Sequence, residues 1–152
     1  MNPLNFPEFD CKIKEENGKW YIFDGIRKKY LVLTPEEWVR QHIVNFLIHH
    51  RQYPKSLIRL EGGTQFNEVR GRSDIVVFGR DGNPFLLVEC KAPEIKLSQR
   101  DIEQLGIYNL NHRAAYIMLS NGLQNHVYHI DHASKKASWL ENIPEFPLVD
   151  FL

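Results

Sequence analysis

Residues 72–91, RSDIVVFGRDGNPFLLVECK, hold two apolar runs joined by a short polar stretch, and they decide the fold expected of this chain. The polar stretch at 80–83, RDGN, has the Gly and Asn that connect antiparallel strands in tight turns. The two runs, 72–79 and 84–91, therefore predict a β-hairpin. The second run ends in Glu89 and Lys91, although a strand that only filled a core would need neither charge.

Strand geometry predicts where these charged side chains lie. Side chains alternate between the two faces of a strand, so Glu89 and Lys91 share one face while Cys90 points to the other, into the core. Across the turn, Asp74 is expected roughly opposite Glu89 and Lys91. Two carboxylates and one ammonium group therefore converge at one end of the predicted sheet.

This group of charges has a chemical use. Adjacent carboxylates repel each other unless a cation lies between them, and their hard oxygen atoms favour Mg²⁺, with Mn²⁺ as a substitute. Asp74 and Glu89 are therefore the predicted metal ligands, and Lys91 could position the attacking water or stabilise charge on a phosphate. The alternative is an ordinary cross-strand ion pair that contributes under about 1 kcal/mol to stability.

Further strands are predicted on both sides of the hairpin, where apolar alternation is bounded by turn residues. Asn17-Gly18 favours a tight turn between the first two of them. The tail from residue 131 is expected to pack extended against the domain. The other expected strands are CKIK and KWYIFD within residues 11–24, a third near 29–33, then 57–66, 114–120 and 126–130.

Two helices are predicted from their capping motifs. Thr34 stands before an apolar periodic segment, and Glu37 three residues later would complete a capping box. Ser98 precedes the second helix, with Asp101 in the same relation. The sequence therefore predicts an α/β domain with a mixed central sheet, flanking helices and an N-terminal hairpin extension. The three tryptophans are expected in the core: Trp20, Trp38 and Trp139.

The composition is that of an ordinary folded domain of 152 residues, with 43% hydrophobic and 25% charged residues. Nineteen basic and nineteen acidic residues cancel, so contacts with nucleic acid must come from local patches such as Arg27-Lys28-Lys29. Cys11 and Cys90 form no CxxC motif, which fits a reducing cytoplasm. No segment has the pattern of a signal peptide or the length of a membrane span, so a cytoplasmic protein is expected.

A second signal comes from the helix after Ser98. Gln104 and Tyr108 lie one turn apart and so share a face. In order and spacing, RSDIVVF, LLVECKAP and QLGIYN resemble the D, ExK and QxxxY motifs of the PD-(D/E)XK nuclease superfamily. Specifically, about residues 20–130 resemble the N-terminal nuclease domain of type I restriction enzyme R subunits.

The resemblance implies a restriction-endonuclease-like fold and a role for each motif residue. Asp74 and Glu89 would bind the metal, and Lys91 would act on the attacking water or the phosphate. Gln104 and Tyr108 would position DNA or the lysine. Many members of the superfamily add a glutamate from the first helix; Glu37 is the candidate, with its capping role as the competing explanation, and Glu61 is the alternative.

The implied function is a Mg²⁺-dependent DNA endonuclease whose partners are DNA and other restriction or repair subunits, with a homo-oligomer left open. The chain has no Walker A motif, so ATP-driven translocation is not expected of it. The competing hypothesis is a non-catalytic nucleic-acid-binding or assembly module that keeps the nuclease fold. Residues 1–152 are expected to form one domain, with the hairpin at 11–33, the nuclease core at about 34–130 and the tail at 131–152.

Overall fold

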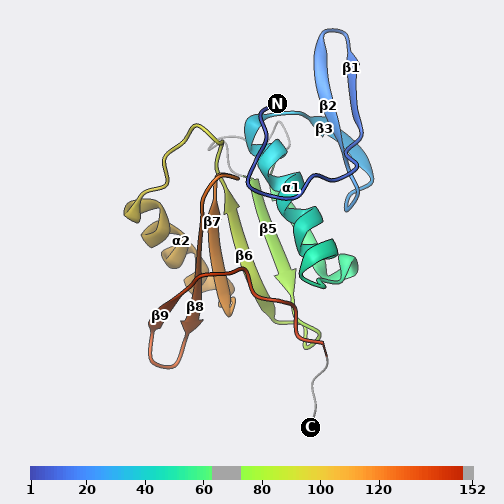
Figure 1. Ribbon diagram of the computed structural model, residues 1–152. Coiled ribbons are helices and arrows are strands. Elements are labelled where there is room, and N and C mark those ends of the chain that lie inside the picture. The colour runs from blue at the N-terminus through green and yellow to red at the C-terminus, as the bar shows by residue number, and fades with distance from the viewer. Residues whose placement is uncertain (63–72, 149–152) are drawn as a thin grey trace.

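The computed structural model describes residues 1–62 and 73–148, with the backbone alone for Ser73 and Asp74. This part of the chain forms a six-stranded sheet, a separate three-stranded sheet and two α-helices (Figure 1). In chain order the elements are β1 (Ile13–Glu16), β2 (Lys19–Asp24), β3 (Lys29–Val32), α1 (Pro35–His50), a 3-10 turn (Lys55–Leu57), β4 (Ile58–Gly62), β5 (Ser73–Phe78), β6 (Pro84–Cys90), α2 (Gln99–His112), β7 (Tyr116–Ser120), β8 (Asn125–Asp131) and β9 (Lys136–Leu140).

The six-stranded sheet is mixed, as predicted, and runs in the order β4-β5-β6-β7-β8-β9. Strands β4, β5 and β6 form the expected antiparallel meander. Strand β7 pairs with β6 in parallel, and β8 and β9 follow antiparallel. Because parallel neighbours need a crossover, the chain passes through α2 between β6 and β7. The predicted α/β fold is confirmed. Of the strand expected at 57–66, the last four residues lie outside the described residues.

The β5–β6 hairpin forms around the turn that the sequence predicts. Gly82 has a φ of +85°, a conformation that glycine adopts without steric cost. The Asp81 carboxylate accepts a hydrogen bond from the backbone N–H of Asn83 at 3.0 Å, which closes the turn. The register shifts by one residue between Val77 and Phe78, beside the turn, and beyond this irregularity Asp74 pairs with Glu89.

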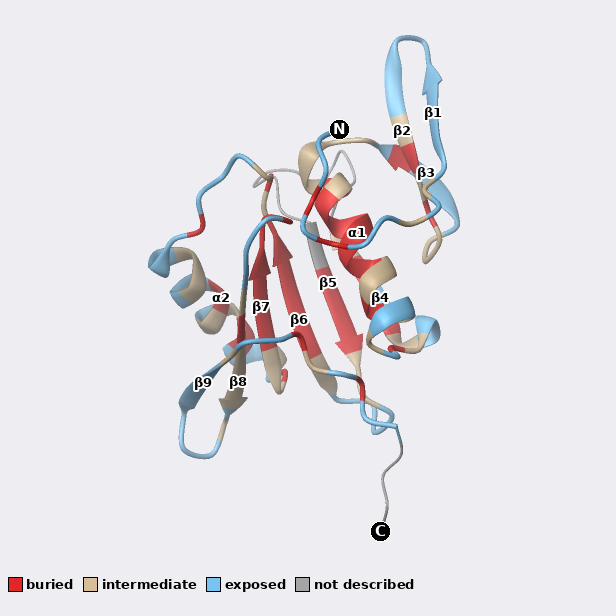
Figure 2. Cartoon of the chain, viewed as in Figure 1, coloured by how far each residue is buried: buried red, intermediate tan, exposed pale blue. Residues whose placement is uncertain are grey.

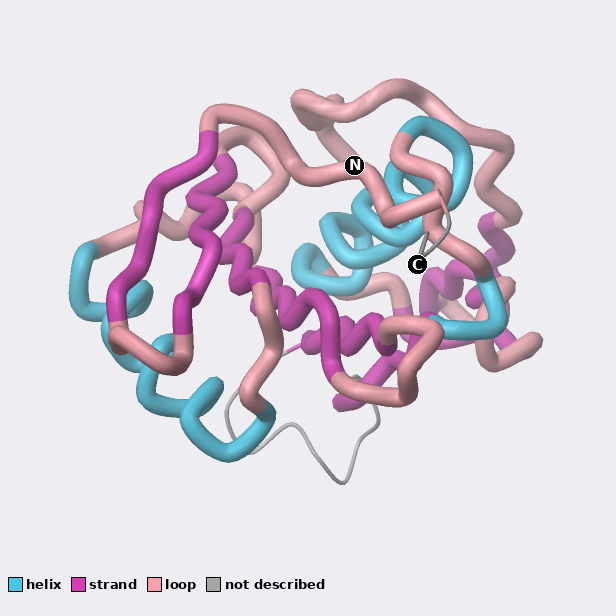
Figure 3. The backbone as a smooth tube through the Cα atoms, turned by 90° about the horizontal axis from the view of Figure 1, so that it is seen from below, coloured by secondary structure: helices cyan, strands magenta, loops and turns pink. Residues whose placement is uncertain are grey.

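The two helices lie on opposite sides of this sheet (Figure 3). Helix α1 is buried on all sides in its middle, at residues 39–44, whereas α2 buries only Leu105 and Asn109 (Figure 2). No helix of the described part is long and apolar enough to cross a membrane. The cluster under α1 includes Val39, Ile43, Leu47, Ile75, Val77, Leu86, Val88 and Met118. The smaller cluster under α2 includes Val76, Leu87, Leu105, Ile117 and Leu119.

The two predicted capping boxes differ in outcome. At α2 the box is complete, because Ser98 Oγ accepts from the N–H of Asp101 and the Asp101 carboxylate accepts from the N–H of Ser98 at 3.2 Å. At α1 Thr34 Oγ1 accepts from the N–H of Glu37 at 3.0 Å. The Glu37 carboxylate, however, bonds Arg40 instead of returning to Thr34, so the second half of that prediction is wrong.

The region after residue 131 is more ordered than an extended tail. Residues Lys136–Leu140 form β9, which pairs with β8 at the edge of the sheet. The sequence gives little sign of this strand because its side chains are mostly exposed on both faces. Beyond it the expected packing is confirmed: Phe146 is buried, and Arg51 Nε donates to the carbonyl of Ile143 at 2.9 Å.

The prediction of three core tryptophans is wrong for two of them. Trp20 is 53% exposed near the end of the β1–β2 hairpin, and Trp139 is 60% exposed on the outermost strand β9. Trp20 lies in the three-stranded sheet and Trp139 in the edge strand of the six-stranded one, and neither belongs to a core cluster of the described residues. Trp38 is partly buried against the α1 cluster, and its indole N–H donates to the carbonyl of Asn2 at 3.0 Å.

Candidate active site

Three acidic residues occupy paired backbone positions on three neighbouring strands at the end of the sheet, and we call this set the carboxylate row. Glu61 on β4 pairs with Asp74 on β5, and Asp74 pairs with Glu89 on β6. The Cα atoms of directly paired residues are about 4.5–5.5 Å apart in antiparallel strands. The predicted position of Asp74 opposite Glu89 is therefore confirmed by the backbone register, whereas the Asp74 side chain lies outside the described residues.

Glu89 and Lys91 lie together where β6 ends. The Glu89 side chain is 2% exposed, and its Oε2 atom lies 3.3 Å from the Nζ of Lys91, whose side chain is 27% exposed. Leu87 packs in the cluster under α2, and alternation puts Glu89 on the same side of the sheet. Cys90 is buried on the α1 side, as predicted. The pair thus combines a buried carboxylate with an ammonium group that reaches solvent.

The segment after Lys91 is held by the neighbouring strand β7. The backbone N–H of Lys91 donates to the carbonyl of Ser120 at 2.8 Å. Asn121 is buried, and its side-chain amide donates to the carbonyl of Ile95 at 2.8 Å. Its bond anchors the segment that leads from Lys91 to α2.

Asp101 is a neighbour of Lys91 that the sequence did not reveal. Its Oδ2 atom accepts from Ser98 in the capping box, while its Oδ1 atom lies 3.9 Å from the Lys91 Nζ. The ammonium group therefore has carboxylates on two sides, Glu89 on the sheet and Asp101 on the helix. The capping motif was visible in the sequence, but its second use depends on how α2 packs.

Gln104 and Tyr108 continue the helix face that begins at Asp101. They follow Asp101 by three and seven residues, which is the spacing of one helix face. Gln104 is exposed, and Tyr108 packs partly against the α2 cluster, where its ring centroid lies 4.6 Å from that of His112. Because Asp101 approaches Lys91, this face starts at the end of the carboxylate row and extends away from it.

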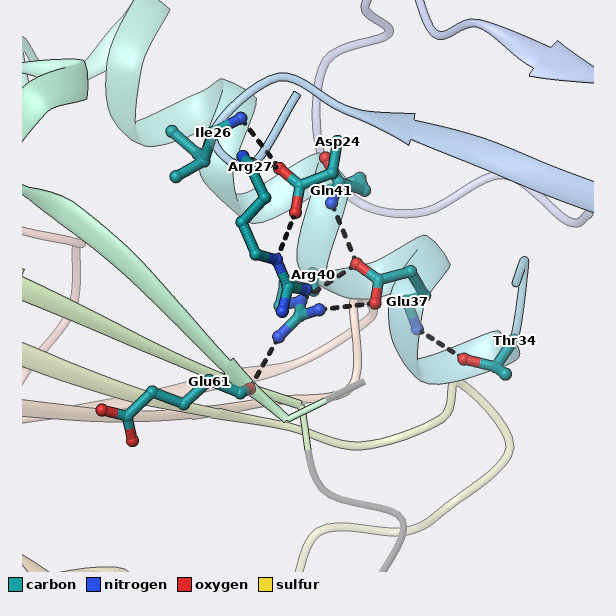
Figure 4. A network of polar contacts seen from close by, with 8 residues as sticks. All are labelled: Asp24, Ile26, Arg27, Thr34, Glu37, Arg40, Gln41 and Glu61. Atoms are coloured by element: carbon teal, nitrogen blue, oxygen red, sulfur yellow. Dashed lines mark hydrogen bonds and ion pairs between the residues drawn. The ribbon is translucent and has the colours of Figure 1, made fainter. Parts of the chain in front are cut away.

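Glu37 is buried in a network on α1 (Figure 4). Its two carboxylate oxygens accept from the Arg40 guanidinium at 2.6 and 2.9 Å, and one of them also accepts from the Gln41 amide at 2.9 Å. The side chains of Glu37 and Arg40 are 1% and 0% exposed. Both oxygens are thus used by a rigid, wholly buried ion pair.

Glu61 connects to this network through its backbone only. Its carbonyl oxygen accepts from Arg40 Nη1 at 2.7 Å, while its side chain points away from Glu37 (Figure 4). The Glu61 carboxylate lies 3.0 Å from Arg59 Nη2 and is one-third exposed. Of the two glutamates considered for the site, Glu61 is the one that belongs to the row containing Asp74 and Glu89.

The donor chemistry of this row fits a hard divalent cation. Among side chains that the structure describes, no three His, Cys, Asp or Glu residues gather closely enough to hold a metal. That set does not include the Asp74 side chain, the central member of the row. Lys91 can offset only one negative charge, so two acidic residues at adjacent positions favour a further cation, and carboxylate oxygens suit Mg²⁺ or Mn²⁺.

The chain is similar to a known protein family over the elements that form this site. A family model of the type I restriction enzyme R protein N terminus matches residues 35–144, most of the chain. The chain belongs to this family. No curated protein matches it.

The family match runs from the start of α1 to just beyond β9. It includes the full carboxylate row, Lys91 and the helix with Gln104 and Tyr108. The resemblance expected for the R-subunit N terminus is thereby confirmed for these elements. The three-stranded sheet β1-β2-β3 precedes the matched residues, so the resemblance expected from about residue 20 is not covered there.

Proposed function

We propose that this chain is a Mg²⁺-dependent DNA endonuclease domain of the PD-(D/E)XK type, which hydrolyses phosphodiester bonds. The observation that carries the proposal is the pair at the end of β6. A buried Glu89 carboxylate lies beside the backbone position of Asp74 and 3.3 Å from the Lys91 ammonium group. Membership of a restriction-enzyme family supports the same reaction class. DNA and the other subunits of such an enzyme are its proposed partners.

Asp74 and Glu89 would hold the metal, with Glu61 as a third oxygen donor at the end of the row. When bound, a divalent cation supplies an acidified water and stabilises charge on a phosphate oxygen. Mn²⁺ has the same preference for oxygen ligands and should substitute. Burial of Glu89 keeps its carboxylate in a fixed orientation, because a buried side chain packed on all sides has few alternative rotamers.

Lys91 would act on the attacking water or on the phosphate. Its ammonium group lies between the sheet and α2, and its partial exposure lets it meet an anionic substrate. Asp101 would limit where the ammonium group lies, because it approaches from the helix side. A cation held near the scissile phosphate stabilises the charge that develops during cleavage.

Gln104 and Tyr108 would position the DNA strand or the lysine from the helix face that begins at Asp101. Glu37 receives a different role. Since both of its oxygens are engaged by Arg40, we assign it to holding Arg40, which in turn holds the carbonyl of Glu61 at the end of β4. This role supports the row from the other side of the sheet without metal ligation.

Incubation of the protein with supercoiled and linear DNA tests the proposal. Cleavage is expected with Mg²⁺ or Mn²⁺ and should stop when EDTA removes the metal. Glu89→Gln keeps the shape of the side chain but removes its charge, so it should abolish metal-dependent cleavage. Glu103→Gln, which changes an exposed glutamate on α2, is the matched control and should cleave like the wild type.

Two results would contradict this function. Cleavage that persists in EDTA would show that no divalent metal is needed. A wild-type protein that cuts neither DNA form with either metal would favour the non-catalytic module, which binds nucleic acid or assembles with other subunits without hydrolysis.

A further inference from the structure

The three-stranded sheet β1-β2-β3 projects from the domain and has one covered and one open face (Figure 1). Ile22 and Leu31, which are paired across β2 and β3, are buried on the covered face. The open face bears side chains of alternate residues on the three strands. We name it the lysine–aromatic face; it carries Lys12, Lys14, Lys19, Tyr21, Phe23 and Tyr30, together with Glu16 and Val32.

Lysines and aromatic rings are interleaved on this face. The Nζ of Lys14 lies 4.3 Å from the ring centroid of Tyr30, and the Nζ of Lys12 lies 5.7 Å from that of Phe23. Tyr30 is 38% exposed, although it is a large aromatic residue. The rings of Phe23 and Tyr30 meet edge to face, 5.3 Å apart. Two of the lysines thus lie close to two rings that contact each other, one of which is exposed.

The charge of this sheet differs from that of the whole protein. Residues 11–33 contain six Lys or Arg and three Asp or Glu, whereas the full chain is balanced. Asp24 is 0% exposed and pairs with Arg27 at 2.9 Å, so one charge of each sign is neutralised there. The lysine–aromatic face carries three lysines and one acidic residue, Glu16, which pairs with Lys14 at 3.2 Å. The face is therefore a local positive surface.

We infer that the lysine–aromatic face binds single-stranded DNA. The lysines match the phosphates of the strand in charge, and a base can stack on an exposed ring such as Tyr30. Stacking on a ring requires an unpaired base, which favours a single strand over a duplex. The acidic residues Glu15 and Glu16 near the end of the hairpin disfavour its insertion into a groove of duplex DNA.

This inference rests on the proposed function, because it takes DNA as the substrate, and it adds a second contact outside the carboxylate row. A strand held on the projecting sheet would be anchored independently of the catalytic step. Since binding needs no metal ligand from Asp74 or Glu89, it is expected to persist in EDTA. Binding and cleavage can therefore fail separately.

The test is the affinity of the full chain for a fluorescein-labelled oligodeoxythymidylate of about 12 nucleotides, a typical site size, measured by anisotropy in EDTA. Tyr30→Ala should weaken binding about tenfold, as expected for one lost stacking contact, with the salt dependence unchanged. Lys12→Ala with Lys14→Ala should weaken binding and lower the slope of log affinity against log salt by about 1.4, or 0.7 for each phosphate contact. Lys135→Ala with Lys136→Ala, a matched pair of exposed lysines around the start of β9, should change neither quantity.

Several outcomes would overturn the inference. One is that the wild type shows no binding to the oligonucleotide, and another is that the Lys12/Lys14 double variant binds it as tightly as the Lys135/Lys136 control. The third such outcome is a wild type that binds a DNA duplex as tightly as the single strand, together with a Tyr30→Ala variant that binds like the wild type. An acidic protein partner would be indicated instead by two results together. Polyglutamate would displace the oligonucleotide at a similar concentration of negative charge, and Tyr30→Ala would bind the oligonucleotide as tightly as the wild type. Metal-dependent cleavage in any of these cases would leave the proposed function standing. Binding without cleavage under any metal would uphold the inference alone.

Discussion

The two sides of the central sheet each bury a glutamate close to a cation, and the two pairs differ in what their partners allow. On the α1 side, Glu37 has both oxygens bonded by the Arg40 guanidinium, and neither side chain reaches solvent. On the α2 side, Glu89 is equally buried, but the Lys91 ammonium group beside it is 27% exposed. Burial alone therefore does not distinguish a functional carboxylate. The two pairs differ in the exposure of the cationic neighbour, 0% for Arg40 and 27% for Lys91.

Arg40→Met tests the α1 pair and has the largest expected effect on stability. Removing one partner of a buried ion pair leaves the other charge uncompensated, and such changes cost about 3–5 kcal/mol. Arg40→Met should lower the free energy of unfolding by that amount, measured by urea denaturation. Arg59→Met is the control: its pair with Glu61 is exposed, so it should cost less than about 1 kcal/mol.

A double variant sharpens the same point. Glu37→Leu combined with Arg40→Met removes both charges, so much of the lost stability should return. Recovery should be incomplete, because the bond from Arg40 to the carbonyl of Glu61 is also gone. If Arg40→Met alone is no more destabilising than Arg59→Met, the α1 pair does not have the structural role assigned to it.

Lys91→Ala tests the other side of the sheet. If Lys91 stabilises developing charge, the variant should lose cleavage by about 10²–10³-fold at fixed Mg²⁺. Its stability should fall by less than that of Arg40→Met, because Lys91 is partly exposed and water can replace its ammonium group beside Glu89. Plasmid cleavage and urea denaturation are measured in parallel, with Lys96→Ala as an exposed lysine control expected to match the wild type.

An active Lys91→Ala protein would refute the chemical role of the lysine. If that variant kept full cleavage and lost up to about 1 kcal/mol of stability, Lys91 would be an ordinary partner of Glu89 at the end of a strand. The Glu37–Arg40 and Glu89–Lys91 pairs would then differ only in how far the cationic side chain is exposed to solvent.

Much of this arrangement could be predicted because it depends on local rules. Alternation of side chains is enough to put Glu89 and Lys91 on one side of the sheet and Cys90 in the core on the other, whereas the pairing of Asp74 with Glu89 also depends on a register shift between Val77 and Phe78. The Ser98–Asp101 capping box is equally local and formed as predicted. Patterns of this kind are fixed by backbone geometry within a few residues.

The remaining features depend on packing between distant segments. Arg40 is a local i,i+3 partner of Glu37 on the same helix, but the burial of both side chains and the bond from Arg40 to the distant carbonyl of Glu61 come from tertiary packing. The approach of Asp101 to Lys91 exists only because α2 lies against the end of β6. Strand β9 lacks an apolar face, so its pairing with β8 left no periodic signal.

The smallest expected effect concerns His42, which lies on α1 and is 6% exposed. Its ring contacts those of Phe9 and Trp38 edge to face, at centroid distances of 4.8 and 4.4 Å, and its Nδ1 lies 2.8 Å from the Trp38 carbonyl. Burial lowers the pKa of His42 below its usual 6.5, and the bond to Trp38 opposes this only in part.

The sign of the pH effect follows from the two states. As pH falls through about 6.5, the unfolded chain takes up a proton at this histidine while the folded protein still holds it neutral. This contribution to stability is therefore complete above pH 6.5, is lost as pH falls toward the folded pKa, and levels off below it. Urea denaturation of wild type and His42→Phe across this range isolates it, because all other titrating groups are common to both proteins. The stability difference should shift against the wild type as the pH is lowered; a difference independent of pH would show that burial on α1 leaves the titration of His42 unchanged.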